Sequence, residues 1–441
     1  MSLRTALPLL LVACSAASAE APPNRAPTVT APATLEAREG ESATATIAAS
    51  DADGDPLTAT VAASSDLRAT IAAKAGGTFE LRVDASHDEG DHQVTVTVSD
   101  GKTTRDVVVD VRVARMKWGA RWDLVPQGVE EREHPATLFD AAHDRILVLG
   151  GSGYRPQNTP LGDTWQLSVK TGAATRLTVE GDALPKVGSM RVAPVPDTST
   201  AYLYGGYSVD QAGQETLVAD VYLADFAGDA VKLTRLAQDV APPARSLHGF
   251  SYDDVSKRLF VFGGVDGGST ILDDLWVGTV AAGRVAWQEK TPPVRPSKRY
   301  GFFFGQYQGR TLVFSGAQGL ASLKPARDLW ALDTRAAEPT FSKLLEGEDV
   351  PEGRRNGCFA VDVTRGRFYV YGGTPDAKKS APGFWVYDAR ESVGRFTQLS
   401  RENAPPLRSS GVGVVDPRDG AAYFGFGNDA TIYADLTRFG F

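Results

Sequence analysis

The sequence has few cysteines and histidines for its length, and it has no long apolar run. Two cysteines and five histidines occur among 441 residues. If Cys14 is modified, as argued below, Cys358 has no partner, which excludes an intramolecular disulfide. No run of about 18 apolar residues follows the N-terminal segment, so we expect no membrane-spanning helix.

An excess of positive charge is lacking as well. The formal net charge is −8, which argues against a nucleic-acid-binding surface, because such surfaces are basic. The sequence contains no Gly-x-Ser-x-Gly elbow, no His-Glu-x-x-His motif and no phosphate-binding loop. The reactions that depend on those motifs are therefore excluded.

The feature that dominates the sequence is a repeat. A hydrophobic strand that ends in glycine recurs every 52 to 58 residues, and an aromatic residue follows each copy. Two independent markers in step indicate a repeat architecture. The first position after each strand is Gly150, Gly205, Gly263, Ser315, Gly372 and Gly425, and the aromatic residues are Trp165, Tyr222, Trp276, Trp330, Trp385 and Tyr433.

Each unit resembles a kelch repeat, whose blades are four-stranded sheets arranged as a β-propeller. The resemblance covers residues 118–441 and implies an all-β fold with a six-bladed propeller. Only five outer strands follow their blades in the sequence. We therefore expect Trp122–Val125 to supply the sixth, beside the C-terminal strand near Tyr433. Closure of the ring in this way removes exposed sheet edges.

Residues 1–14 resemble a bacterial lipoprotein signal. Leu11 to Ala13 precede Cys14 as a lipobox precedes a lipidated cysteine. The alternative is an ordinary secretory signal that is cut after Ala19. Residues 15–27 are too polar to form a core and predict a flexible tether. Ser15 after the cysteine favours an outer-membrane lipoprotein, with a periplasmic or secreted protein as the alternative.

Residues 28–113 predict a separate β-sandwich, because short alternating strands are divided by turns. Their Asp-rich segments resemble bacterial cadherin-like or immunoglobulin-like domains. Asp51, Asp53 and Asp55 offer clustered carboxylates, which calcium prefers. The alternative is that Asp-Gly-Asp-Pro is simply a favourable turn. No cofactor is expected, unless these aspartates bind calcium.

Galactose oxidase resembles the chain broadly, because a sandwich domain also precedes its kelch propeller. Its copper site requires two histidines, tyrosines and a crosslinked cysteine. Here the propeller contains only His134, His143 and His248, and no histidine lies near Cys358 in the sequence. The resemblance therefore extends to the fold and not to the copper site, and no catalytic residue is predicted.

Basic residues recur just before each innermost strand, a position that opens onto the central channel in kelch propellers. One interpretation is a face that accepts an anion. The other is that the arginines bind the backbone and carboxylates of a neighbouring blade. The candidate ligand-binding residues are Arg191, Arg245, His248, Arg299, Arg355 and Arg408.

Two classes of function fit these patterns. The first is an envelope lipoprotein whose propeller binds or scaffolds a protein or polysaccharide partner, with an anionic partner as one option. The second is a carbohydrate-active enzyme, similar to an epimerase or a lyase, with its site at the mouth of the channel. In both cases we expect the lipid anchor to be the only membrane contact and nucleic acid not to be a partner.

Overall fold

The computed structural model describes residues 23–63, 67–85, 91–153, 159–210, 212–321, 324–376 and 380–441. The chain divides into two compact units between Ala114 and Arg115. Cys14 and most of the predicted tether lie outside the described residues. In the described part, strands predominate and the helical segments are two 3₁₀ turns, Val125–Gln127 and Gly347–Asp349. None of the described helices has the length and apolar character needed to cross a bilayer.

The first unit is a sandwich of two four-stranded sheets, ordered β1-β3-β6-β5 and β2-β8-β7-β4. Alternate side chains point inward, as the sequence pattern predicts. Ile47, Leu81, Val96 and Val109 are fully buried in the shared core. The strands are β1 (Thr28–Thr30), β2 (Thr34–Arg38), β3 (Ser42–Ser50), β4 (Thr58–Ala63), β5 (Arg68–Lys74), β6 (Thr78–Asp84), β7 (His92–Ser99) and β8 (Thr104–Ala114).

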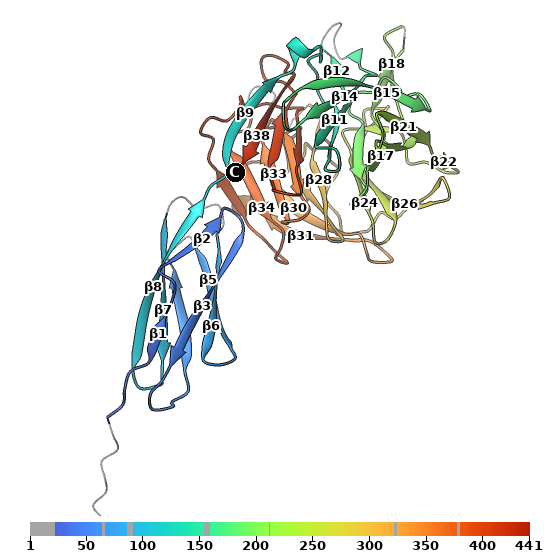
Figure 1. Ribbon diagram of the computed structural model, residues 1–441. Coiled ribbons are helices and arrows are strands. Elements are labelled where there is room, and N and C mark those ends of the chain that lie inside the picture. The colour runs from blue at the N-terminus through green and yellow to red at the C-terminus, as the bar shows by residue number, and fades with distance from the viewer. Residues whose placement is uncertain are drawn as a thin grey trace, which may run out of the picture. The chain divides into compact units, whose positions relative to one another are not determined.

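The second unit is a six-bladed β-propeller (Figure 1), which confirms the predicted fold. Each blade has four antiparallel strands. Blade one contains β10 (Ala136–Asp140), β11 (Arg145–Leu149), β14 (Thr164–Ser168) and β15 (Ala174–Gly181). Blade two contains β16 (Arg191–Pro194), β17 (Thr200–Tyr204), β20 (Val221–Asp225) and β21 (Ala230–Arg235). Blade three contains β24 (Gly249–Asp253), β25 (Arg258–Asp266), β26 (Ile271–Ala281) and β27 (Arg284–Glu289).

The other three blades follow the same order. Blade four contains β28 (Phe303–Tyr307), β29 (Arg310–Phe314), β30 (Asp328–Asp333) and β31 (Thr340–Glu346). Blade five contains β32 (Cys358–Asp362), β33 (Arg367–Tyr371), β34 (Phe384–Asp388) and β35 (Phe396–Leu399). Blade six contains β36 (Val412–Val415), β37 (Ala422–Gly425) and β38 (Asp435–Gly440), and its outer strand is β9 (Lys117–Asp123).

Strand β9 therefore comes from the start of the propeller and pairs antiparallel with β38 at its end, with Trp122 opposite Leu436. Trp118 of the same strand packs against the aromatic side chains of blades five and six. The sixth blade thus joins the two ends of the ring.

A separate hydrophobic cluster fills each of the six interfaces between neighbouring blades. Both faces of a blade must be apolar for this packing. The five residues of β11 and the five of β33 are accordingly all buried. Blades one and two are joined further by parallel pairing of β15 with β21.

The sixth repeat is displaced by one residue from the sequence prediction. Phe426 and Gly427, and not Gly425 and Phe426, adopt the positive φ angles of the glycine pair, at 53° and 78°. The Phe426 amide donates to the carbonyl of Asp435, as the Gly150 amide does to that of Asp163. Asp435 is therefore the aspartate of this unit, and Tyr433 is not its repeat aromatic.

Candidate functional site

Six residues with positive φ form the inner ring of the propeller, one from each blade: His134, Ser189, Leu247, Gly301, Asn356 and Ser410. In four of the six steps, the backbone amide of one residue donates to the carbonyl of its neighbour in the next blade. The bonds are Gly301 to Leu247 (2.9 Å), Asn356 to Gly301 (2.7 Å), Ser410 to Asn356 (2.5 Å) and His134 to Ser410 (2.7 Å). Direct backbone contact of this kind makes the channel narrow at this level.

In five blades, a fully buried arginine lies two residues before the residue of the inner ring. These arginines are Arg132, Arg245, Arg299, Arg354 and Arg408. Arg245 is typical. Its Nη1 donates to the Gly263 carbonyl at 3.0 Å and to Asp274 at 2.7 Å, and its Nη2 donates to Asp274 at 2.7 Å. Bidentate pairing of this type is strong and geometrically specific.

The same pairing accounts for two more predicted ligand-binding residues. Arg299 pairs with Asp328 and Arg408 pairs with Asp435, and both guanidinium groups are at most 1% exposed. The carboxylate belongs to the arginine's own blade, and not to the neighbouring blade of the alternative interpretation. Arg245, Arg299 and Arg408 therefore stabilise their own blades through these ion pairs and are too deeply buried to reach a ligand.

His248 is also buried, at 1% exposure. It lies against the ring of Tyr204 and directly beside Gly205, where an added Cβ would be 2.3 Å from its Cε1. Burial holds the pKa of His248 well below its usual value, and Arg191 and Arg245 add to the effect. The histidine is therefore a neutral part of the core between blades two and three.

Arg191 and Arg355 differ from the buried arginines. In blade two, Val187 stands where the other blades have the buried arginine, since its carbonyl accepts from Gly151 as that of Arg245 accepts from Gly206. Arg191 follows four residues later, at the start of β16, and its Nε donates to the His248 carbonyl at 3.0 Å. Arg355 follows Arg354 in blade five and lies over the ring of Tyr300, 5.5 Å from its centroid.

Neither of these two arginines pairs with a carboxylate in the described part of the chain. The Nε of Arg355 is buried with no hydrogen-bond partner among those residues. Blades two and five are opposite each other in a ring of six, so the two side chains come from opposite walls. Both act on His134 of the inner ring, whose pKa is lowered to about 3 by burial, by Arg191 and by Arg355. Both guanidinium groups are therefore close enough to His134 of the inner ring to affect its charge.

The rim of the channel adds polar groups from blades one and two. The Ser152 hydroxyl and the Tyr207 hydroxyl are 2.5 Å apart. Glu133 precedes the ring residue of blade one, and burial raises the pKa of its carboxyl group. Two short hairpins carry this rim: β12 (Ser152–Gly153) with β13 (Thr159–Pro160), and β18 (Tyr207–Val209) with β19 (Glu215–Leu217).

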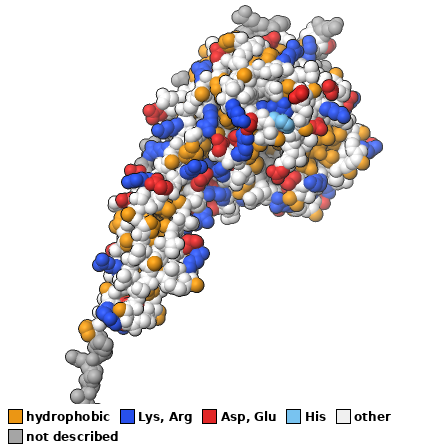
Figure 2. Space-filling model, viewed as in Figure 1, with side chains coloured by type: hydrophobic (Ala, Val, Ile, Leu, Met, Phe, Trp, Pro, Cys, Tyr) orange, Lys and Arg blue, Asp and Glu red, His pale blue; other side chains and the backbone are white. Residues whose placement is uncertain are grey.

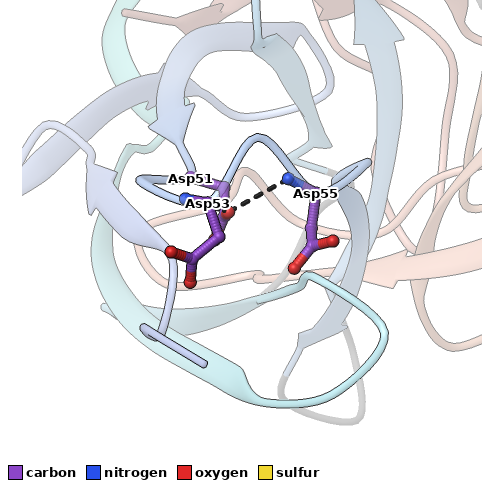
Figure 3. Close-up of side chains that lie close together, drawn as sticks. All are labelled: Asp51, Asp53 and Asp55. Carbon is purple, nitrogen blue, oxygen red and sulfur yellow. Dashed lines mark hydrogen bonds between the residues drawn. The ribbon is translucent and has the colours of Figure 1, made fainter. Parts of the chain in front are cut away.

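The aspartates predicted to bind calcium do lie together in the first unit. Their nearest carboxylate oxygens are within 4.8 Å of one another. Figure 3 shows the carboxylates of Asp53 and Asp55 on the same side of the loop, with the Asp55 amide bonded to Asp51. Asp53 forms an ion pair with Arg25 at 2.7 Å, and Asp55 forms one with Lys102 at 2.8 Å. A cation here would take over the role of these two basic side chains.

Comparisons with known proteins agree with the two-part architecture. Residues 197–415 match the KLHDC2/KLHL20/DRC7 Kelch-repeats domain, and residues 24–112 match a bacterial Ig domain. An F-box/kelch-repeat protein of Arabidopsis thaliana is 28% identical over 158 residues, which are 34% of this chain and 32% of that protein. The chain thus spans about a third of the length of this curated relative.

The solved structure of YjhT aligns with a TM-score of 0.52 over 70% of this chain and 94% of that chain, at 13% identity. At this level of identity the likeness concerns the fold alone.

Proposed function

Because the chain carries a kelch-repeat domain and a bacterial Ig-like domain, we propose that it is an envelope-anchored binding protein whose propeller accepts an anionic group at the channel. The partner is a protein or a polysaccharide that presents a carboxylate or a similar anion. The anchor is a lipid on Cys14, which holds the protein at the outer membrane.

The observation that carries the proposal is the pair Arg191 and Arg355. These guanidinium groups come from opposite blades and lack a carboxylate partner in the described residues, whereas Arg245, Arg299 and Arg408 each have one. Like charges that converge repel each other unless an anion or water lies between them. An anion bound there would be held by charge-assisted hydrogen bonds, which are stronger than neutral ones.

The rest of the surface favours a localised site. Basic and acidic side chains are interspersed on the face shown in Figure 2, and the formal net charge is −8. The attraction for an anion would therefore arise in the channel and not from a broad basic field.

The test uses an array of neutral, carboxylated and sulfated glycans together with acidic peptides. We expect the protein to bind anionic members, and Arg191→Ala and Arg355→Ala each to weaken that binding at least tenfold with little change in melting temperature. Arg299→Ala is the matched control. It should leave binding intact in the folded protein but reduce stability by about 3–5 kcal/mol, because Asp328 loses its partner. If Arg355→Ala bound the array like the unchanged protein, the channel would not be the binding site.

A second candidate function is an enzyme that acts on a small polar substrate at the same channel mouth. Glu133 supports it, because a carboxyl group whose pKa is raised by burial is suited to proton transfer. It lies beside His134 and near the hydroxyl of Tyr207. Incubation with a panel of carbohydrates, with Glu133→Gln as the comparison, distinguishes the two candidates. Turnover that is lost in Glu133→Gln would favour the enzyme, and binding without turnover would favour the module.

A further inference from the structure

A carboxylate lies between a buried arginine and a tryptophan in three blades. In blade one, Asp163 accepts from Arg132 at 2.7 and 2.9 Å and from the indole nitrogen of Trp165 at 2.6 Å. The same three-residue arrangement recurs in blade three with Arg245, Asp274 and Trp276, and in blade four with Arg299, Asp328 and Trp330. The acceptor satisfies a positive charge and a polar N–H that would otherwise be buried alone.

Blade five retains both donors without the acceptor. Gly383 stands where the repeat has its aspartate, two residues before Trp385. Arg354 is 1% exposed, and its side chain donates only to carbonyls: Glu352 at 3.0 Å, Gly372 at 3.0 Å and Pro382 at 3.3 Å. No carboxylate pairs with it in the described part of the chain. The indole nitrogen of Trp385 is buried and also has no hydrogen-bond partner there.

Both donors lie at Gly383. The Nη2 of Arg354 contacts the carbonyl of the preceding residue, Pro382. A Cβ built on Gly383 would lie 2.4 Å from the indole nitrogen of Trp385. The indole nitrogen and the guanidinium group therefore both lie next to residue 383, the position that carries the carboxylate in the other blades.

The burial of Arg354 and of the Trp385 N–H is unfavourable if no acceptor lies between them. A buried charge without a partner costs several kcal/mol, and a buried unsatisfied N–H costs about 1–3 kcal/mol. Burial lowers the pKa of Arg354 to about 10, which leaves the side chain protonated at neutral pH. Glu352 is the acidic residue nearest in the sequence, but only its backbone carbonyl bonds to Arg354.

We propose that blade five binds a small monovalent anion between Arg354 and Trp385, in place of the carboxylate that the other blades supply. A carboxylate group and a chloride ion are both small enough to accept hydrogen bonds from two neighbouring donors. The planar fork of a guanidinium group favours the carboxylate, because it can then make two parallel hydrogen bonds. Formate is accordingly the first probe and chloride the second.

The experiment is thermal unfolding of the protein at constant ionic strength, in which sodium formate or sodium chloride replaces the sodium salt of a bulky sulfonate. A ligand that binds only the folded state raises the melting temperature with concentration until saturation. We expect this rise in the unchanged protein and its loss in Arg354→Met. Trp385→Phe should require roughly tenfold more formate for the same rise, because one hydrogen bond to the anion is gone.

Arg299→Met is the matched control, because Asp328 already occupies the equivalent position in blade four. It should lower the melting temperature and keep the response to formate. The series is repeated in an Arg355→Ala background, so that an anion in the channel does not contribute. A response that survives there belongs to blade five, whatever the outcome for the proposed function.

A larger response to formate than to chloride would support a carboxylate ligand, and equal responses would support a small anion of either type. The proposal is overturned if the unchanged protein responds to neither anion, or if Arg354→Met responds like the unchanged protein. Should Arg354→Met fail to fold, Trp385→Phe decides the question, since an unaltered formate response would also refute the site.

Discussion

Arg354 and Arg355 are adjacent in the sequence but have different surroundings. Arg354 is enclosed within its blade, whereas Arg355 is only partly buried and lies over Tyr300 at the channel. The structural role thus belongs to the first position and the proposed binding role to the second. Arg355 also acts on His134, since both Arg191 and Arg355 lower the pKa of this histidine.

Acid should destabilise the propeller through His134. Its pKa is about 3 in the folded protein and near 6.5 when unfolded, so between these values the unfolded chain binds the proton first. Stability from this group therefore falls as the pH decreases from about 6.5 towards 3, by at most about 1.4 kcal/mol per pH unit. His134→Asn should remove that part of the slope in urea unfolding at a series of pH values. Asparagine suits the site, because Asn356 adopts a similar φ of 52° in blade five.

A slope that is identical in His134→Asn and the unchanged protein would contradict this prediction. Arg245→Met is unsuitable as a control because it breaks a buried ion pair. His143→Asn serves instead: His143 lies in the turn after β10 and is more exposed, at 39% of its side chain, and the change affects one hydrogen bond, to Asp140.

The sequence predicted basic residues near the channel, but it did not show which of them form ion pairs with aspartates of their own blade. The aspartates that pair with Arg245 and Arg299 lie 29 residues later in the chain, and no local pattern links the two positions. Blade two makes paired and unpaired arginines harder to distinguish in the sequence. Val187 replaces the buried arginine there, and Arg191 follows four residues later. The regular spacing of arginine and aspartate across the units is the pattern that could have identified these pairs.

At the level of elements, the alternating strands and glycine pairs were sufficient to predict six blades. Both features follow from local chemistry: each blade buries two faces, and the first glycine of most pairs has a positive φ, 58° at Gly263. The prediction failed where a unit departs from the pattern. In the sixth unit Phe426 takes the first glycine position, and the displacement is shown by the positive φ of Phe426 and by its hydrogen bond to Asp435.

Strand β9 should contribute heavily to the stability of the propeller. Trp118 is 7% exposed, and its ring lies 5.1 to 5.7 Å from the rings of four aromatic residues of blades five and six. Trp118→Ala should therefore cost about 3–5 kcal/mol in chemical denaturation. Lys117→Ala, on the same strand and exposed, should change stability by less than about 0.5 kcal/mol. Equal stability of the two variants would mean that β9 does not hold the ring closed.

The aspartate loop of the first unit gives a prediction about calcium. We expect calcium to raise the melting temperature of that unit in the full protein and a chelator to reverse the effect, because carboxylate oxygens are the ligands that calcium prefers. Asp53→Asn with Asp55→Asn should abolish the response. If the chelator has no effect on the unchanged protein, the loop is a turn that is held by Asp51 and the two ion pairs.

For the whole molecule, the lipid anchor is the prediction with the widest consequence. Several acyl chains at about 0.8 kcal/mol per buried CH₂ would hold the protein stably on a membrane. Cys14→Ala should move it to the soluble fraction and abolish labelling by radioactive palmitate. Cys358→Ala is the control and should keep the label, because that thiol is fully buried in blade five. Palmitate label that persists in Cys14→Ala would refute the anchor.

The pairing of β9 with β38 also imposes an order on biosynthesis. Lys117 is made more than 300 residues before Gly440, its partner across the sheet. During translation, β9 remains unpaired until β38 has been made, and its aromatic side chains are exposed to other chains until then. A product that stops before β38 leaves the ring open and exposes sticky edges to proteases and chaperones. Folding of the propeller is therefore completed only after β38 has been made.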